Sequence, residues 1–241
     1  MVPALIVTKY TVPQAEVGHI ARDRLMGKML AGLSHTCTLI SAPAGFGKSS
    51  AAIELVGRSQ MQVAWLSLDR EDNDPSRFGA YLVAALRHSG LLMGEEMEAL
   101  LRLSEQPPLE ALVAIAINAV AAAGRHFVLV LDDYHWIAAD EIHEAVATLL
   151  HHRPRNLHVV IATRLRPALP LSWLKARGEL LEITATDLRF SEQEAAGFLH
   201  RTMGLDLPKT GVADLTARTE GWVTGLKLAA LSLRGASDCP G

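Results

Sequence analysis

The sequence is poor in the features of secreted, metal-binding and membrane-embedded proteins. It holds two cysteines, Cys37 and Cys239, which are too few and too far apart for a disulfide framework or a zinc-binding knuckle. Its longest apolar run, 112–123, contains Asn118 and is too short to cross a bilayer. The first residues lack the basic region and long apolar stretch of a signal peptide. These absences predict a cytoplasmic protein with no membrane contact, in a compartment that keeps Cys37 reduced.

An excess of charge of either sign is also absent. The chain has 23 lysines and arginines against 26 aspartates and glutamates, for a formal net charge of −3. A domain whose main task is to bind nucleic acid usually carries a basic surface, so this stretch is not expected to bind DNA itself. Its 241 residues are 49% apolar and 20% charged, which is typical of a globular protein with one large domain, alone or with a smaller one.

What the sequence does contain is a strand, a glycine loop and a helix in the order that holds a nucleoside triphosphate. Gly45 and Gly47 let the backbone turn its N–H groups inward around phosphates, and the N-terminus of the following helix adds further free N–H groups. Lys48 is expected to reach the β- and γ-phosphates, and the Ser49 hydroxyl to bind Mg²⁺. The residues expected to line a site for ATP or ADP are Pro43, Ala44, Gly45, Phe46, Gly47, Lys48, Ser49 and Ser50.

The loop departs from the phosphate-loop consensus at one position. Ala42 stands where G-x-x-x-x-G-K-[ST] has its first glycine, and that position flanks the loop, where another small residue fits. The alternative is an ordinary glycine-rich turn between a strand and a helix. The strand-to-helix context of Gly47, Lys48 and Ser49 favours the phosphate-binding interpretation.

Two aspartates follow the most apolar strand expected in the chain, 127–131. Asp132 ends this run, and open α/β sheets bind ligands at the carboxyl ends of their strands. Asp132 is therefore expected to bind Mg²⁺, directly or through a water molecule. Asp133 is expected to orient the attacking water or act as the base, and an aspartate here, in place of the commoner glutamate, suits slow hydrolysis. The alternative is that both are ordinary turn residues.

Arginines near two other segments are further candidates. Arg164 follows the expected strand 157–162, and its guanidinium group suits a γ-phosphate if this strand lies beside the phosphate-loop strand. Arg22 and Arg24 precede the first strand and are candidates for contacts with the base or the sugar. For all three arginines, an ordinary role at the protein surface stays open.

Several histidines invite a metal site, but their spacing argues against one. No compact ligand spacing relates them, and no cysteine lies nearby, so metal binding is not expected at these side chains. The four considered are His135, His143, His151 and His152. Magnesium bound with the nucleotide is the metal that the sequence predicts.

Strand-forming and helix-forming segments alternate over most of the chain. This alternation predicts right-handed crossovers and a parallel sheet covered by helices on both faces. An extended segment is expected over about 1–19 and a first helix from residue 20 to about 33. The expected strands are 37–42, 63–68, 127–131, 157–162 and 180–183. Only helices are expected after the sheet, beginning at a capping box formed by Ser191 and Glu194. We predict a P-loop domain over 1–188 and a helical lid subdomain over 189–241, with a ragged end at 235–241 that suggests a longer natural protein.

Short motifs along nearly the whole chain match one protein family in their order. They are Ser41-Ala42-Pro43-Ala44-Gly45-Phe46-Gly47-Lys48-Ser49, Trp65-Leu66-Ser67-Leu68-Asp69, Asp72-Asn73, Arg77-Phe78, Tyr81-Leu82, Leu131-Asp132-Asp133-Tyr134-His135, Ala162-Thr163-Arg164, Leu188-Arg189-Phe190-Ser191, Glu194-Ala195, Gly221-Trp222 and Leu226-Lys227-Leu228-Ala229. In these motifs the sequence resembles the nucleotide-binding region of the ATP-dependent LuxR-type transcription regulators. This is the group of the maltose-regulon activator, within the signal-transduction ATPases with numerous domains (STAND).

The resemblance implies a fold and a set of contacts. The fold is the α/β three-layer sandwich of P-loop NTPases, with a five-stranded parallel sheet in the order 5-1-4-3-2 and a helical subdomain over the nucleotide. By position, Lys48, Ser49, Asp132 and Arg164 would contact the nucleotide and Mg²⁺. The helices around Gly221-Trp222 would sense which nucleotide is bound.

The resemblance also implies how such a protein works. Family members hold ADP at rest, exchange it for ATP when an inducer binds, and then self-associate. The winged-helix, sensor and DNA-binding modules of the family are missing from this chain, so the inducer and the promoter would be recognised outside it.

Three functions are compatible with these observations. The first is a regulatory switch that binds ATP or ADP with Mg²⁺ and hydrolyses ATP slowly. The second is a dedicated ATPase or small-molecule kinase, which would need a second-substrate motif that we do not find. The third is an interaction scaffold that keeps ADP without hydrolysing ATP. Fast turnover of Mg-ATP would indicate the second, slow and partner-dependent turnover the first, and no turnover the third.

Overall fold

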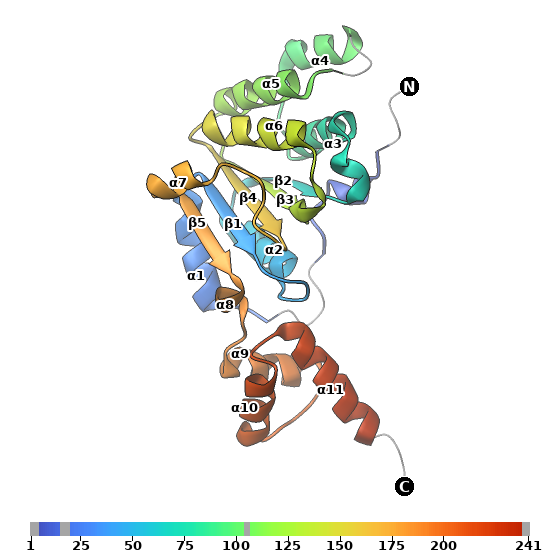
Figure 1. The fold of residues 1–241 in the computed structure, drawn as a ribbon, viewed down its shortest axis with the longest axis vertical. Coiled ribbons are helices and arrows are strands. Elements are labelled where there is room, and N and C mark those ends of the chain that lie inside the picture. Colours follow the sequence, from blue (N-terminus) through green and yellow to red (C-terminus); the bar gives the residue numbers. More distant parts are fainter. Residues whose placement is uncertain (1–4, 15–19, 104–106, 238–241) are drawn as a thin grey trace.

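The structure, a computed structural model, describes residues 5–14, 20–103 and 107–237 (Figure 1). At its centre lies a five-stranded sheet in the order β2-β3-β4-β1-β5, with parallel pairing between all neighbours. The strands are β1 Cys37–Ser41, β2 Gln62–Ser67, β3 Phe127–Asp132, β4 Leu157–Thr163 and β5 Leu180–Thr184. Read from the other edge, this is the order 5-1-4-3-2, so the predicted fold is confirmed.

Helices cover both faces of the sheet (Figure 1). Those that precede the C-terminal cluster are α1 Asp23–Ala31, α2 Lys48–Ser59, α3 Pro75–His88, α4 Gly94–Leu103, α5 Leu109–Ala122, α6 Asp140–His151, α7 Ser172–Ala176 and α8 Ala185–Leu188. Apolar residues of α3, α5 and α6 pack on one face of the sheet, and those of α1 and α2 on the other. The result is the three-layer arrangement of helices, sheet and helices.

The central strands are continuous apolar runs because both of their faces are buried. Every residue of β3 and of β4 is buried. Along β3, Leu129 and Leu131 belong to the apolar cluster on the α3, α5 and α6 side, whereas Val128 and Val130 belong to the cluster on the α1 and α2 side. The alternation follows from the two-residue period of a strand, and it leaves Asp132 at the carboxyl end.

A separate helical cluster lies beyond the carboxyl ends of the strands (Figure 1). It consists of α9 Glu192–Gly197, α10 Lys209–Arg218 and α11 Val223–Ser237, with a π-helical turn at Phe198–Thr202, and we call it the lid. The lid has its own apolar core. Ile20, from the segment before α1, packs into this core, so the lid is not built from one continuous stretch of chain. A domain boundary at 188/189 stays a prediction.

Several local predictions were wrong. The N-terminal segment was expected to be extended, but Val7–Lys9 forms a 3-10 turn. Here the Lys9 ammonium pairs with the fully buried Asp72 and with Asp69, the latter at 2.8 Å. This ion pair joins the N-terminal segment to the turn after β2, a contact between residues that are distant in sequence and carry no local signal.

The ends of some helices also differ from expectation. The first helix was expected from residue 20, but α1 begins at Asp23, because Ile20 packs into the lid. The short helices α7 and α8 were not predicted. The tail expected at 235–241 is helical as far as Ser237, and 238–241, with Cys239, lie outside the described residues.

A buried histidine makes the stability of this fold sensitive to acid. His158 on β4 is 1% exposed; its Nδ1 lies 2.9 Å from the carbonyl of His35, and its Nε2 lies 3.0 Å from the hydroxyl of Thr38. A neutral ring that donates from Nδ1 and accepts at Nε2 satisfies both contacts. Burial lowers the pKa of His158 from 6.5 to about 4. The folded protein therefore holds this ring neutral at pH values at which the unfolded chain protonates it.

We expect His158 to remove stability as the pH falls from 6.5 to 4. The unfolded chain binds a proton in this range and the folded chain does not, so the free energy of unfolding decreases by up to about 3 kcal/mol. Denaturant unfolding of the wild type and of His158→Gln, measured at pH 7 and at pH 4.5, tests this. The variant should lose less stability between the two pH values, and equal losses would contradict the prediction.

Candidate functional site

The phosphate loop, residues 42–47, connects the carboxyl end of β1 to α2. Gly45 and Gly47 have φ angles of 74° and 78°, a left-handed conformation that is costly for residues with a Cβ atom. Gly47 is the N-cap of α2, so the unpaired N–H groups of the first helical turn lie at the loop. Ala42 is buried, and its N–H donates to the carbonyl of Thr163 at 3.2 Å. This position beside β4 has room for a small residue, so an alanine fits where the phosphate-loop consensus has its first glycine.

The serine that ends the loop motif meets the aspartate of β3, and the lysine before it lies at the loop. The hydroxyl of Ser49 donates to a carboxylate oxygen of Asp132 at 3.0 Å, although 83 residues separate the two in the chain. The Lys48 ammonium is largely buried and donates to the carbonyl of Pro43 at 3.1 Å. Burial lowers the pKa of Lys48, and the positive charge of Arg164 lowers it further, while Asp133 and Asp132 oppose this. The fold thus brings together a glycine loop, an ammonium group and two carboxylates.

The chemistry around Asp132 fits a bound divalent cation. Burial raises the pKa of Asp132 to about 6, the neighbouring charge of Asp133 adds to this rise, and the hydrogen bond from Ser49 opposes it. A buried carboxylate beside a hydroxyl is an oxygen donor set of the kind that Mg²⁺ prefers. A cation would offset the cost of keeping this carboxylate ionised, so Ser49 and Asp132 are suited to hold Mg²⁺ with a nucleotide.

A histidine that sequence reasoning considered only as a metal ligand lies in this site. The Nδ1 of His135 is 3.6 Å from a carboxylate oxygen of Asp133. Both ring nitrogens of His135 are buried and have no hydrogen-bond partner among the described residues, and burial lowers the pKa of the ring. The ring is therefore neutral near pH 7. The signal that could have revealed it is its position directly after the strand end, two residues beyond Asp133.

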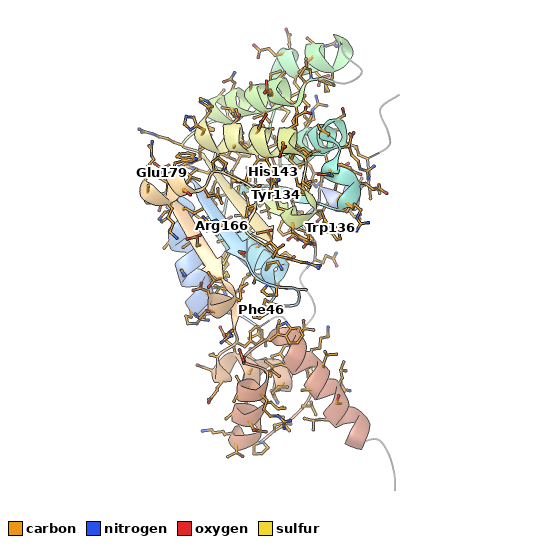
Figure 2. All side chains as sticks on the ribbon, viewed as in Figure 1. Phe46, Tyr134, Trp136, His143, Arg166 and Glu179 are labelled. Atoms are coloured by element: carbon orange, nitrogen blue, oxygen red, sulfur yellow. The ribbon has the colours of Figure 1, made fainter. Side chains whose placement is uncertain are left out.

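The remaining histidines have structural contacts. His143 is buried, and its Nδ1 lies 2.9 Å from the hydroxyl of Tyr134; Figure 2 labels this pair. The ring of His151 packs edge-on against Trp173, with centroids 5.2 Å apart. Within the described residues, no group of three or more His, Cys, Asp or Glu side chains is placed to hold a metal ion.

Arg164 lies at the edge of the sheet where the phosphate loop begins. β4 pairs with β1 in parallel, with Thr163 opposite Ser41. The strand before Arg164 therefore lies beside the phosphate-loop strand, as a contact between Arg164 and a γ-phosphate requires. Arg164 is exposed, yet its charge lowers the pKa values of Lys48 and His135. Its guanidinium group is thus close enough to the site to act on an anion there, and the contact itself stays a prediction.

Arg22 and Arg24 have partners in the chain that the sequence did not indicate. The guanidinium of Arg22 is buried and donates to the carbonyl of Leu188 at 2.9 Å and to that of Arg189 at 3.2 Å. Arg24 donates to the carbonyl of Asp187 at 2.9 Å. Both arginines therefore hold the connection between β5 and the lid. A contact with the base or the sugar stays a prediction.

The other predicted loop residues lie between the sheet and the lid. Pro43, Ala44 and Ser50 are exposed, and Figure 2 shows Phe46 at the junction with the lid helices. The ring of Phe46 lies against Trp222 of the lid, with centroids 6.3 Å apart. The carboxyl ends of the strands, the phosphate loop and the lid thus meet in one region.

Comparison with solved structures identifies the class of fold. A STAND protein with a tetratricopeptide repeat sensor from Pyrococcus horikoshii matches with a TM-score of 0.58 and 17% identity, over 90% of this chain and 30% of that one. The Walker-type ATPase of Pyrococcus abyssi matches with a TM-score of 0.56 and 15% identity, over 90% of this chain and 69% of that one. The fold is that of the P-loop ATPases.

Sequence comparison then identifies a particular group of relatives. The chain is 35% identical to the HTH-type transcriptional regulator MalT of Serratia proteamaculans over 231 residues, which are 95% of this chain and 25% of MalT. MalT of Yersinia enterocolitica is also 35% identical, over 230 residues, with the same coverage. No protein-family model matches. The chain is homologous to a region of the MalT regulators, which confirms the resemblance of the motifs, and it spans about a quarter of their length.

Proposed function

We propose that this chain is the ATP- and ADP-binding switch module of a MalT-like transcription regulator, acting in the cytoplasm. The observation that supports it most is the hydrogen bond of 3.0 Å from Ser49 to Asp132 beside the phosphate loop, where the Lys48 ammonium also lies, 3.1 Å from the carbonyl of Pro43. An ammonium group, a hydroxyl and a buried carboxylate at a helix N-terminus match the chemistry of a magnesium nucleotide. In the described residues no helix is long and apolar enough to span a bilayer.

Each group of the site has a role in binding. The loop N–H groups around Gly45 and Gly47 hold the phosphates, and Lys48 adds a positive charge to the β- and γ-phosphates. Ser49 and Asp132 hold Mg²⁺, which supplies positive charge against the phosphate oxygens when it is bound. Arg164 meets the γ-phosphate and so distinguishes ATP from ADP.

Hydrolysis, in this proposal, is slow and resets the switch. Asp133 is 43% exposed at its side chain and lies beside the neutral ring of His135. The exposed carboxylate of Asp133 is placed to orient a water molecule or accept its proton. An aspartate reaches less far than a glutamate, which is consistent with inefficient activation of water.

ATP and ADP would favour different arrangements of the sheet and the lid. A ligand shifts such an equilibrium only through contacts that differ between the two states, and here the γ-phosphate with Arg164 supplies the difference. Self-association in the ATP state is part of this proposal and is what the resemblance to the regulators implies. DNA would be contacted through parts of the regulator other than this chain.

Two measurements on the purified chain test the proposal. Nucleotide released by denaturation and separated by chromatography should be ADP or ATP. Turnover of Mg-ATP by the nucleotide-free protein should be measurable but slow, because the water is poorly activated. Fast turnover would favour a dedicated ATPase or kinase. Absence of ATP and ADP binding at millimolar concentration would refute the proposal.

A further inference from the structure

The lid contacts the phosphate loop through backbone carbonyls. The indole Nε1 of Trp222 donates to the carbonyl of Ala44 at 3.2 Å. The hydroxyl of Thr224 donates to the carbonyl of Gly45 at 3.0 Å, and the backbone N–H of Thr224 donates to the same oxygen at 3.3 Å. Trp222 and Thr224, which we call the latch pair, lie at the start of α11, and their partners lie at the tip of the loop.

The packing around these hydrogen bonds is close. A Cβ atom added at Gly45 would lie 2.4 Å from the hydroxyl oxygen of Thr224 and 2.9 Å from the Nε1 of Trp222. A Cβ atom added at Gly225 would lie 2.8 Å from the Trp222 ring. The ring of Phe46 also lies against the Trp222 ring, with centroids 6.3 Å apart. Trp222 is thus held between α11 and the loop, and both glycines permit the approach.

The side of the loop that the latch pair contacts has a consequence for phosphate binding. In a trans peptide unit the carbonyl and the N–H group point in opposite directions. The carbonyls of Ala44 and Gly45 belong to the same peptide units as the N–H groups of Gly45 and Phe46. Donors of the lid that bind these carbonyls therefore hold the N–H groups of the same peptide units pointing away from the lid.

We propose that Trp222 and Thr224 are positioning residues that couple closure of the lid to an occupied diphosphate site. This inference rests on the proposed function and adds the route by which the lid responds. Phosphate oxygens on the N–H groups and lid donors on the carbonyls favour the same orientation of the two peptide units. Each interaction strengthens the other, since hydrogen-bonded groups polarise one another, and the coupling is reciprocal.

The β-phosphate and the γ-phosphate of a nucleotide act on different groups of the site. The loop N–H groups hold the β-phosphate, which ADP and ATP share, so the latch pair responds equally to both and not to AMP. The γ-phosphate is contacted by Lys48 and by groups on the strand ends, Arg164 among them. The latch pair thus reports that the site is filled, and it does not report which nucleotide fills it.

The test compares variants that remove donors with variants that keep them. Trp222→Phe retains a ring without Nε1, and Thr224→Val replaces the hydroxyl by a methyl group of similar size, whereas Thr224→Ser keeps the donor. Thr219→Val is the matched control, because its hydroxyl donates to Leu215 within α10. Calorimetry with ADP, AMP and a non-hydrolysable ATP analogue gives the affinities, and hydrogen exchange of the α11 amides reports closure of the lid.

We expect the double variant Trp222→Phe, Thr224→Val to bind ADP and the ATP analogue about tenfold more weakly, by equal factors, since each donor contributes about twofold to tenfold. AMP binding should not change. ADP should slow α11 exchange in the wild type, in Thr224→Ser and in Thr219→Val, and much less in the double variant. Unchanged affinity for ADP in the double variant, or a loss confined to the ATP analogue, would overturn the latch, whereas a wild type that binds no nucleotide would refute the proposed function instead.

Discussion

Replacing Lys48 by alanine is expected to weaken ADP and ATP binding by about a hundredfold or more. The Lys48 ammonium lies at the loop, 3.1 Å from the carbonyl of Pro43, and hydrogen bonds to charged groups contribute about 1.5–3 kcal/mol each. A phosphate accepting from Lys48 would lose both this bond and its positive charge. Calorimetric titration of both nucleotides into the purified variant measures the effect.

Two further variants distinguish a loss of nucleotide affinity from a loss of folding stability. Lys48→Met retains the aliphatic stem and should lose nucleotide affinity to the same extent as alanine. Its unfolding free energy should not decrease, because burial already lowers the pKa of Lys48 and the charge gains nothing from being buried. Lys209→Met removes an exposed lysine at the start of α10 and should bind nucleotides as the wild type does. Wild-type affinity in both Lys48 variants would contradict the assignment of the site.

Changing Asp132 to asparagine is expected to abolish the effect of Mg²⁺ on nucleotide binding and turnover while stabilising the nucleotide-free protein. An asparagine oxygen can still accept from Ser49 and from the backbone N–H of Asp133, the contacts that Asp132 makes now. The substitution removes a buried carboxylate whose pKa is raised to about 6. Its ionised form at pH 7 therefore costs stability, and we expect a gain of about 1–2 kcal/mol. Titrations with and without Mg²⁺, and denaturant unfolding, measure the two effects.

The pH dependence provides an internal control for Asp132. Protonation of this carboxylate competes with Mg²⁺, so in the wild type the affinity for the magnesium nucleotide should fall below pH 6, by up to about tenfold per pH unit. The folded protein takes up this proton at a higher pH than the unfolded chain. Through Asp132, lowering the pH therefore increases the free energy of unfolding, whereas through His158 it decreases it. A variant that still responds to Mg²⁺, with the wild-type pH profile, would exclude Asp132 as the magnesium ligand.

Much of the sheet was predictable because its signals are local. Continuous apolar runs such as Phe127–Leu131 mark strands buried on both faces, and Gly45 and Gly47 mark the turn between a strand and a helix. The strand order came from the family resemblance of the motifs and was confirmed. The short helices α7 and α8 were missed, because so few residues carry no clear period.

The contacts of individual side chains were less predictable. Arg22 was a candidate for the base or the sugar, and in the fold its guanidinium holds backbone carbonyls before the lid. His135 was considered only as a metal ligand, and it lies beside Asp133 with neither nitrogen hydrogen-bonded among the described residues. The Arg22 contacts join residues more than 160 positions apart, so no local pattern could have indicated them, whereas the position of His135 two residues beyond Asp133 is a local signal that was not used.

By itself, the sequence determined the local backbone structure of this protein. Apolar runs determined the strands, and residues that tolerate its dihedral angles determined the phosphate loop. Both depend on interactions over a few residues, which a short segment carries wherever it is placed. The tertiary structure decided which side chains share the site. Parallel pairing of β1 with β4 and of β4 with β3 brings Ser49 to Asp132 across 83 residues, and the packing of the lid brings Trp222 to Ala44 across 178. Such meetings depend on how whole elements pack, because the free energy that selects them comes from burial summed over the entire core.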